Sequence, residues 1–341
     1  MLDVARLAGV SGKTVSRVIN GDGYFSPDVA ARVTQAVADL DFRPNIAARS
    51  LKSERSYNLC LLSEYLSSTY FAEIVAGAAS ACSERGYHLV IEQLHADRPR
   101  RSAMLGLLGR VSLDGFILLP PQTDDQDLLS VLDELKAPYV RISPASQPER
   151  SSCVRAEDAL GVSDLADHLW RMGHRRFGYV SGPFSHAATH IRRESFIDAL
   201  VKNGAERDAI RVAEMPPRLD RAVKNAALEI LVQTGASGLD ALLAHPDPPT
   251  AVFAFSDGIA FGVLSRAQTL GLVVPDQLAV AGFDDSEISK IVFPRLTTIR
   301  QPVSLMATAA VELLIDHPNP PATKVLGVEL VIRGSTESQL A

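Results

Sequence analysis

Apolar residues recur at helical spacing in three short segments at the beginning of the chain. They are Val4, Ala5 and Leu7 in the first segment, Val15, Val18 and Ile19 in the second, and Val29, Val33, Val37 and Leu40 in the third. Two short helices that cross at a glycine-containing turn are typical of a helix-turn-helix motif, and a third helix closes its core. The pattern therefore predicts a small all-α unit.

Turn and cap residues stand where such a unit needs them. Gly9 can adopt the positive φ of the turn at no steric cost, and Ser11 can cap the second helix with its hydroxyl. Ser26 and Pro27 are typical of the N-cap and the first position of the third helix. A fourth, short helical segment follows at residues 46–52, where Asn45 can cap it, and a helix of this length is only marginally stable alone.

From Tyr57 onward, short apolar runs alternate with helical patterns. This alternation predicts parallel sheets with helices on both faces. A second round begins near Cys153 and includes a helix expected over residues 222–235. Two doubly wound α/β lobes in tandem, after the all-α unit, are the economical interpretation.

The charge distribution limits where the chain can contact nucleic acid. The net charge is −6 overall, yet residues 1–55 hold eight Lys/Arg against six Asp/Glu, so the remaining 286 residues carry −8. An acidic body repels DNA. Any DNA contact is therefore expected in the N-terminal unit.

Several other classes of protein lack support. Three scattered cysteines indicate a reducing compartment, and no signal peptide or long apolar run is present, so we expect a cytoplasmic protein without a membrane anchor. Dinucleotide-binding or phosphate-binding glycine motifs are missing, and Ser181 lacks the nucleophile-elbow pattern. The neighbouring histidines His168, His174, His186 and His190 lack metal-binding spacing. We expect a binding protein rather than an enzyme, with no metal and no cofactor.

The runs DVARLAGVSGKTVSRVIN, SPDVAARV and RPNIAARSLK carry a resemblance to the lactose/galactose repressor (LacI/GalR) family of bacterial transcription regulators. The resemblance extends over nearly the whole chain. It implies a helix-turn-helix domain over 1–43, a hinge helix and linker over 44–56, and a two-lobed, periplasmic-binding-protein-like body over 57–341. It also implies three crossings of the chain between the lobes, which places lobe 1 at about 57–152 and 302–314 and lobe 2 at about 153–300 and 325–335.

The resemblance also implies which residues contact DNA. Base-reading positions of the second helix fall on Gly12, Lys13 and Arg17, and since Gly12 has no side chain, readout should fall on the other two. In the family a hinge-helix leucine wedges into the minor groove, and Leu51 matches it. The DNA-binding residues are expected to be Ser11, Lys13, Thr14, Ser16, Arg17, Asn20, Asn45, Ala48 and Leu51.

A small-molecule effector is implied for the crevice between the lobes, where strand ends meet. The expected effector-binding residues are Tyr70, Phe71, Arg192, Asp257, Asp284 and Gln301. Carboxylates and a guanidinium suit the hydroxyls of a sugar, and an aromatic ring suits its apolar face. Alternatives stay open: Asp257 and Asp285 are also placed to cap helices, and Phe71 to face the core of its lobe.

Arg192 is the strongest of these expectations, and Arg193 beside it should face solvent. Arg218 or Arg221 lies where the family often has an aromatic residue. An additional guanidinium there would favour an anionic effector such as a sugar acid over a neutral sugar, whereas a solvated loop arginine would not distinguish them.

The implied function is a homodimeric repressor of carbohydrate or sugar-acid utilisation genes that reads a near-palindromic operator. No heptad pattern precedes Ala341, which favours a dimer over a tetramer. The family usually has several residues before the segment matching Leu2, so we expect either a longer N-terminus or a first helix without its usual cap. The alternatives are a periplasmic-type sugar-binding protein and a regulator that responds to a protein partner.

Overall fold

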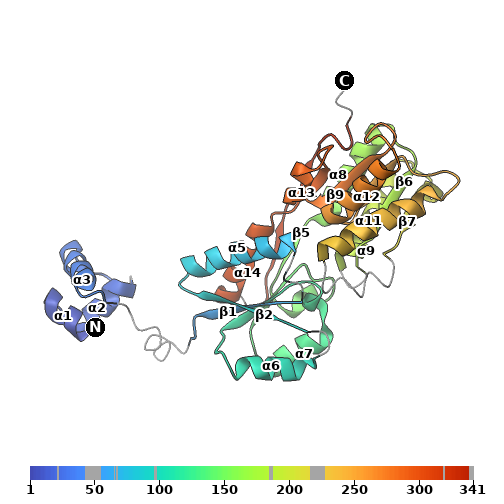
Figure 1. Cartoon of the computed structure of the whole chain (residues 1–341). Coiled ribbons are helices and arrows are strands. Elements are labelled where there is room, and N and C mark those ends of the chain that lie inside the picture. Colours follow the sequence, from blue (N-terminus) through green and yellow to red (C-terminus); the bar gives the residue numbers. More distant parts are fainter. Residues whose placement is uncertain are drawn as a thin grey trace. The chain divides into compact units, whose positions relative to one another are not determined.

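The protein is described by a computed structural model, which covers residues 1–20, 23–42, 55–64, 66, 68–95, 98–183, 187–215, 227–317 and 319–337. The chain divides into two compact units, Met1–Ser56 and Tyr57–Ala341 (Figure 1).

The first unit is a three-helix helix-turn-helix, as predicted. Its helices are α1 (Leu2–Ala8), α2 (Gly12–Asn20) and α3 (Pro27–Asp39). The core consists of Val4, Ala5, Ala8, Val15, Val33 and Ala36. Gly9 ends α1 with φ 65°, which confirms the predicted left-handed turn. The Arg32 guanidinium of α3 donates to the Ala8 carbonyl at 3.1 Å and so ties the third helix to this turn.

The first lobe of the second unit is built on a six-stranded sheet in the order β11-β5-β4-β3-β1-β2. Its strands are β1 (Asn58–Ser63), β2 (His88–Gln93), β3 (Gly115–Leu118), β4 (Tyr139–Ile142), β5 (Cys153–Ala156) and β11 (Thr323–Leu326). Its helices are α5 (Thr69–Glu84), α6 (Arg100–Leu108), α7 (Gln126–Glu134) and α14 (Val303–Asp316), with short 3-10 turns η1 (Gln122–Asp124) and η2 (Pro148–Arg150). All its strand pairs are parallel.

Helices cover both faces of this sheet, and the residue alternation along the strands explains why. In β1, Leu59 and Leu61 belong to the cluster beneath α5 and α14, whereas Cys60 and Leu62 belong to the cluster beneath α6 and α7. Successive side chains of a strand point to opposite faces. A strand buried on both faces therefore needs a continuous apolar run, and Figure 1 shows the two helix pairs on opposite sides of the sheet.

The second lobe repeats the plan with the strand order β12-β10-β9-β8-β6-β7. Its strands are β6 (Phe177–Val180), β7 (Ile210–Ala213), β8 (Ala251–Ala254), β9 (Ala279–Asp284), β10 (Thr297–Arg300) and β12 (Glu329–Val331). Its helices are α8 (Asp158–Arg171), α9 (Ala187–Lys202), α11 (Ala227–Leu243), α12 (Asp257–Thr269) and α13 (Glu287–Ile291), with the turn η3 (Arg207–Ala209). Only β12 of this sheet pairs antiparallel, with β10.

The chain crosses between the lobes three times, as the resemblance implied. The crossings follow β5, β10 and β11. Two boundaries differ from the expected ones: β5 pairs with β4 in the first sheet although the second lobe was expected to begin at Cys153, and β11 pairs with β5 although residues from 325 were assigned to the second lobe. Gly327 and Val328 separate β11 from β12, so one apolar run supplies edge strands to both sheets.

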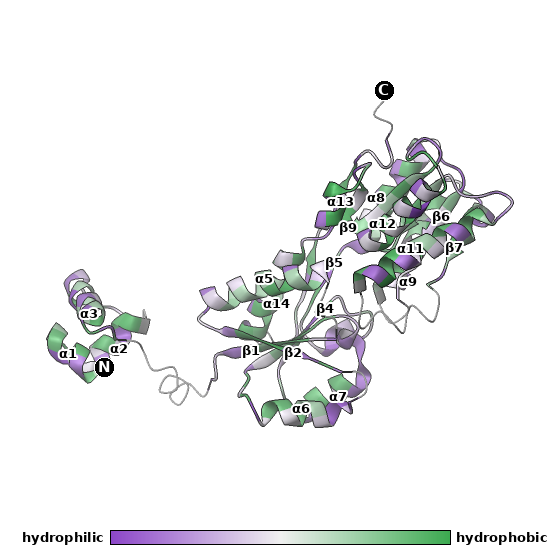
Figure 2. Cartoon of the chain, viewed as in Figure 1, coloured by the Kyte–Doolittle hydropathy of each residue, from purple (hydrophilic) through white to green (hydrophobic). Residues whose placement is uncertain are grey.

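The helix expected over 222–235 differs as well. Residues 222–226 lie outside the described part, and α11 continues past Gly235 to Leu243. A Cβ on Gly235 would overlap the Ile259 carbonyl oxygen of α12. The glycine therefore allows two helices to approach closely instead of ending one. In Figure 2 the helices around the sheets carry both hydrophobic and hydrophilic residues, as helices with one buried and one solvated face require.

No helix in the described part of the chain is both long and apolar enough to span a bilayer.

Candidate functional site

The second helix of the first unit carries exposed basic side chains on one side. Lys13 and Arg17 are exposed and stand four residues apart, whereas Val15 on the opposite side is fully buried. Neither basic residue has an ion-pair partner among the residues the structure describes. Residues i and i+4 lie on the same face of a helix, so both side chains are available to a groove of DNA.

Ser11 organises the beginning of this helix. Its Oγ accepts from the Thr14 amide at 3.1 Å and lies 2.9 Å from the Thr14 hydroxyl, which is the predicted N-cap. A Cβ added to Gly12 would have no atom within 4 Å, so this position faces open space. Thr14 and Ser16 are half-buried. The Asn20 side chain and all of Asn45, Ala48 and Leu51 lie outside the described residues.

The second unit contains a cavity of about 280 Å³ between its two lobes. The first lobe contributes Ser63, Ser68, Thr69, Tyr70, Phe71, Leu119, Pro120 and Ser143. The second lobe and the crossing segments contribute Asp158, Pro183, Ala188, Arg192, Leu228, Leu231, Phe255, Ser256, Gly258, Asp284, Ser286, Ile288 and Gln301. Many of these residues end or follow a strand, which is where open α/β sheets bind ligands.

Arg192 of α9 is held rigidly in the cavity wall. Its Nε donates to Asp158 at 2.9 Å and its Nη1 donates to the Phe255 carbonyl at 2.8 Å. The guanidinium carbon lies 3.5 Å from the ring centroid of Phe283 and 4.7 Å from that of Phe255. For Nη2, the described residues provide no acceptor, so this nitrogen is available to a ligand.

Arg193 is directed elsewhere. It pairs with Glu194 and Glu214, both at 2.9 Å, and does not line the cavity. Its side chain is 23% exposed, so it is partly buried in an ion-pair cluster at the surface instead of fully solvated. Arg193 therefore remains a useful neighbour for comparison with Arg192.

Asp284 and Gln301 form the polar wall near Arg192. The Gln301 amide donates to the Asp284 carboxylate at 2.9 Å. Burial raises the pKa of Asp284, while Arg192 and the Gln301 hydrogen bond oppose the rise. A carboxylate beside a fixed guanidinium can bind neighbouring hydroxyl groups, because the carboxylate accepts from a hydroxyl hydrogen and the guanidinium donates to a hydroxyl oxygen.

Tyr70 and Phe71 stand at the beginning of α5, where Ser68 caps the helix by accepting from the Phe71 amide at 3.1 Å. Phe71 both lines the cavity and packs into the core of the first lobe, so the two interpretations of this residue are compatible. Burial raises the pKa of Tyr70, and Asp284 and Asp158 raise it further. The phenol is therefore neutral near pH 7 and can donate a hydrogen bond.

Asp257 does not line the cavity, in contrast to the expectation. Ser256 is the N-cap of α12, and the fully buried Asp257 carboxylate accepts from the Ser286 amide (2.7 Å), the Ser286 hydroxyl (3.0 Å) and the Thr298 hydroxyl (2.6 Å). Burial, followed by the charge of Asp284, raises the pKa of Asp257. Its role is to hold the segment after β9 against β10.

Sequence reasoning missed Asp158, Ser63 and Ser143. Asp158 is the first residue of α8, where an acidic residue is common because it favours the helix dipole. The strand-end rule could have singled out Ser63, which ends β1, and Ser143, which follows β4. Together with Asp284 and Arg192, Asp158 gives the described cavity wall a formal charge of −1.

Among the described residues, no three His, Cys, Asp or Glu side chains are grouped so that they could hold a metal ion.

Comparison with known proteins extends these observations. Residues 1–45 match the family described as bacterial regulatory proteins, lacI family, and residues 166–336 match the periplasmic binding protein-like domain. The chain is 30% identical over 331 residues to the ribose operon repressor of Escherichia coli strain K12, which covers 97% of this chain and 96% of that protein. It is 28% identical over 343 residues to the HTH-type transcriptional repressor CytR of the same strain, with coverage of 99% and 96%.

Solved structures of transcription regulators have a similar fold over nearly the whole chain. A crystal structure of the Lac repressor dimer bound to operator and the anti-inducer ONPF has a TM-score of 0.75 at 26% identity, and a complex of the transcriptional regulator CelR with cellobiose has 0.72 at 29%. Each alignment covers 98% of both chains.

A helix-turn-helix unit joined in one chain to a two-lobed, periplasmic-binding-protein-like body defines a class of bacterial transcription regulators with a ligand-binding domain. Within that class, the chain belongs to the LacI family.

Proposed function

We propose that the protein is a DNA-binding transcriptional repressor whose operator affinity is set by a sugar bound between the two lobes. The observation that carries this proposal is the cavity wall: a rigid Arg192 with Nη2 available, beside the Asp284–Gln301 pair, in a chain that also carries exposed Lys13 and Arg17 on the second helix of its helix-turn-helix. Relatives whose names denote a ribose operon repressor and a cellobiose-bound regulator support a sugar as the effector.

The charge of the wall favours a neutral sugar over a sugar acid. Asp158 and Asp284 outnumber Arg192, whose charge is already paired with Asp158 at 2.9 Å. An added carboxylate would meet a net negative wall and lose hydration, and among the described lining residues the only cation is Arg192, whose charge Asp158 already balances. Arg218 and Arg221, on which the sugar-acid hypothesis rested, lie outside the described residues.

The protein is proposed to act as a homodimer on a near-palindromic operator, since a two-fold protein reads a two-fold site. A Lac repressor dimer bound to operator is among the similar structures. Ile291 and Phe293 are 79% and 93% exposed, an unusual exposure for large apolar side chains, and we place them in the subunit interface. Because an operator lies on the bacterial chromosome, we propose that the protein acts in the cytoplasm.

The cavity is proposed to bind its ligand without transforming it. Its carboxylates are engaged: Asp158 with Arg192, and Asp284 with Gln301. The relatives are repressors. Incubating the protein with each sugar of the panel below and recovering the sugar unchanged would support binding alone, whereas turnover would contradict it.

The proposal is tested with the full-length protein. An operator is first selected from a random DNA library, and its affinity is then measured by fluorescence anisotropy with D-ribose, D-galactose, cellobiose or D-galacturonate. One neutral sugar should change the operator affinity by about tenfold or more, whereas D-galacturonate should not. Failure of every compound to change operator binding would contradict control by a sugar, and failure to select any sequence would contradict the DNA-binding role.

A further inference from the structure

The carboxylate that lines the cavity lies in an unusual backbone turn. Asp284 ends β9 with φ 114°, and Asp285 follows with φ 56°. Residues with a Cβ rarely adopt positive φ, and two in succession need tertiary contacts to hold them. The conformation of this turn directs the Asp284 side chain toward the cavity.

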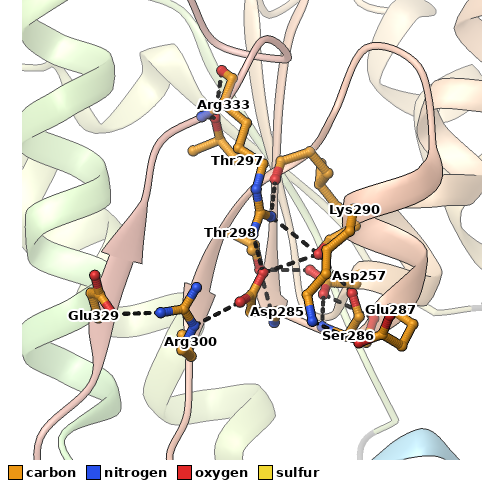
Figure 3. A network of polar contacts seen from close by, with 12 residues as sticks. Asp257, Asp285, Ser286, Glu287, Lys290, Thr297, Thr298, Arg300, Glu329 and Arg333 are labelled. Atoms are coloured by element: carbon orange, nitrogen blue, oxygen red, sulfur yellow. Dashed lines mark hydrogen bonds and ion pairs between the residues drawn. The ribbon is translucent and has the colours of Figure 1, made fainter.

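Asp285 supplies these contacts on the side away from the cavity. Its side chain is only 3% exposed and is held between two arginines, with Arg300 Nε at 2.7 Å and Arg333 Nη2 at 2.5 Å. The Ser289 hydroxyl donates to the same carboxylate at 3.1 Å. Figure 3 shows Asp285 between the two guanidinium groups. The sequence alternative of a helix cap does not hold, because Ser286 is the N-cap residue of α13.

The arginines are themselves fixed by the ends of neighbouring strands. Arg300 is the last residue of β10, and its Nη1 donates to Glu329 of β12 at 2.8 Å. Arg333 Nη1 donates to the Leu296 carbonyl at 2.7 Å. Asp285 is therefore bound to a rigid frame, and although burial opposes ionisation, the two arginines lower its pKa overall.

Backbone hydrogen bonds complete the anchoring of the turn. The Asp285 amide donates to the Thr298 hydroxyl at 3.3 Å, and the Ser286 amide donates to Asp257 at 2.7 Å. Thr298 also donates to Asp257 at 2.6 Å. With its neighbours held in this way, Asp284 is left to contact Gln301 and the cavity.

We propose that Asp285 is a positioning residue of the effector site, whose ion pairs with Arg300 and Arg333 hold the turn that directs Asp284 into the cavity. The inference rests on the proposed function, in which this cavity binds a sugar. Without the charge of Asp285, the turn relaxes and the Asp284 carboxylate no longer stands in one place. Sugar binding weakens although no residue that contacts the sugar has been changed.

The test uses the full-length protein and the variant Asp285→Asn, which keeps the size of the side chain but removes its charge. Asp316→Asn is the matched control, because it removes an equivalent charge from an exposed pair with Arg85 on the first lobe. Arg300→Gln is the milder second variant, since the Arg300 side chain is 47% exposed and its loss leaves the Arg333 pair in place. Asp285→Glu restores the charge.

Three quantities are measured: the Kd for D-ribose, D-galactose and cellobiose by calorimetry, the operator Kd without sugar, and hydrogen exchange of residues 283–290. For Asp285→Asn we expect about a tenfold higher sugar Kd, an operator Kd within about twofold of the unchanged protein, and faster exchange of the Asp285 and Ser286 amides. Arg300→Gln should raise the sugar Kd and speed the exchange of these amides by smaller amounts. Asp285→Glu should restore part of the sugar affinity. A merely structural role would instead weaken operator and sugar binding together.

Unchanged sugar Kd and unchanged exchange in Asp285→Asn and Arg300→Gln would overturn the positioning role, as would an equal effect of Asp316→Asn. If the unchanged protein binds none of the three sugars, the proposed sugar response is contradicted, whereas hydrogen exchange still decides whether Asp285 holds the turn. The sugar response and the positioning role of Asp285 can therefore be refuted independently.

Discussion

The guanidinium of Arg192 offers the sharpest test of the proposed effector site. Arg192→Ala removes Nη2, the one nitrogen of this guanidinium group to which the described residues offer no acceptor, and leaves the backbone of α9 unchanged. It also removes the partner of Asp158, whose side chain is 14% exposed. The variant therefore changes both the ligand contact and the local charge balance.

The expected magnitude follows from these contacts. One hydrogen bond that involves a charged group contributes about 1.5–3 kcal/mol, which corresponds to roughly a 10- to 150-fold increase in the sugar Kd. Leaving Asp158 buried without its partner lowers the free energy of unfolding by about 3 kcal/mol. Since domains are commonly stable by about 5–15 kcal/mol, the variant should still fold at 25 °C.

The assay compares Arg192→Ala with the neighbouring variant Arg193→Ala, whose arginine pairs with Glu194 and Glu214 away from the cavity. Sugar affinity is measured by calorimetry and operator affinity by anisotropy in the absence of sugar. Only Arg192→Ala should lose sugar affinity, and both variants should bind the operator as the unchanged protein does. A sugar Kd within twofold of the original, or an equal loss in Arg193→Ala, would refute the assignment of Nη2 to the ligand.

Four further outcomes are expected. Arg17→Ala should relax base preference at one position of each half-site in binding-site selection, whereas Gly12→Ala, at a position with open space around it, should leave the selected sequence unchanged. Burial lowers the pKa of His168, so its contribution to stability is present above the ordinary value of 6.5 and is lost as the pH falls through the lowered pKa. Between pH 7.5 and 5, the free energy of unfolding measured in urea should therefore fall less in His168→Gln than in the unchanged protein. Gly235→Ala should reduce the free energy of unfolding by about 1–3 kcal/mol in the same assay, because the added Cβ overlaps a carbonyl of α12. Phe293→Asp should shift the dimer toward monomer in sedimentation, and an unchanged sedimentation coefficient would exclude this residue from the interface.

The order of the elements could be predicted from the sequence because each depends on local patterns. The cap at Ser11, the turn at Gly9 and the alternating strands and helices all follow from spacing and residue type. Lobe boundaries could not be placed as well, since Cys153 and Val325 read as strand residues in either sheet. Only pairing over long sequence distance, Val325 with Arg155, assigns β11 to the first lobe.

The residues that line the cavity could be predicted in part, because local patterns also locate the ends of strands and the beginnings of helices. Five of the six expected residues line it, because strand ends and helix beginnings converge there. Asp257 and Asp285 could not be assigned from their pattern: both are acidic residues at the beginning of helices, and only the tertiary contacts with Ser286 and Arg333 reveal buried anchors. An acidic residue that caps a helix and one that anchors a turn through buried contacts cannot be distinguished from the amino-acid sequence alone.

The three crossings have a consequence for synthesis on the ribosome. The first sheet receives its covering helix α14 and its edge strand β11 from residues 303–326, long after β1 to β5 have emerged. Until then, apolar residues such as Leu59 and Ile74 are not covered by α14, whose Met306 and Val311 join them in the same buried cluster. The five strands of the second lobe from β6 to β10 are continuous along the chain, so this part can fold before the first lobe receives α14 and β11, and the second lobe is completed last, when its edge strand β12 emerges. A premature stop after residue 300 would leave the helix-turn-helix with its own core but without a finished first lobe.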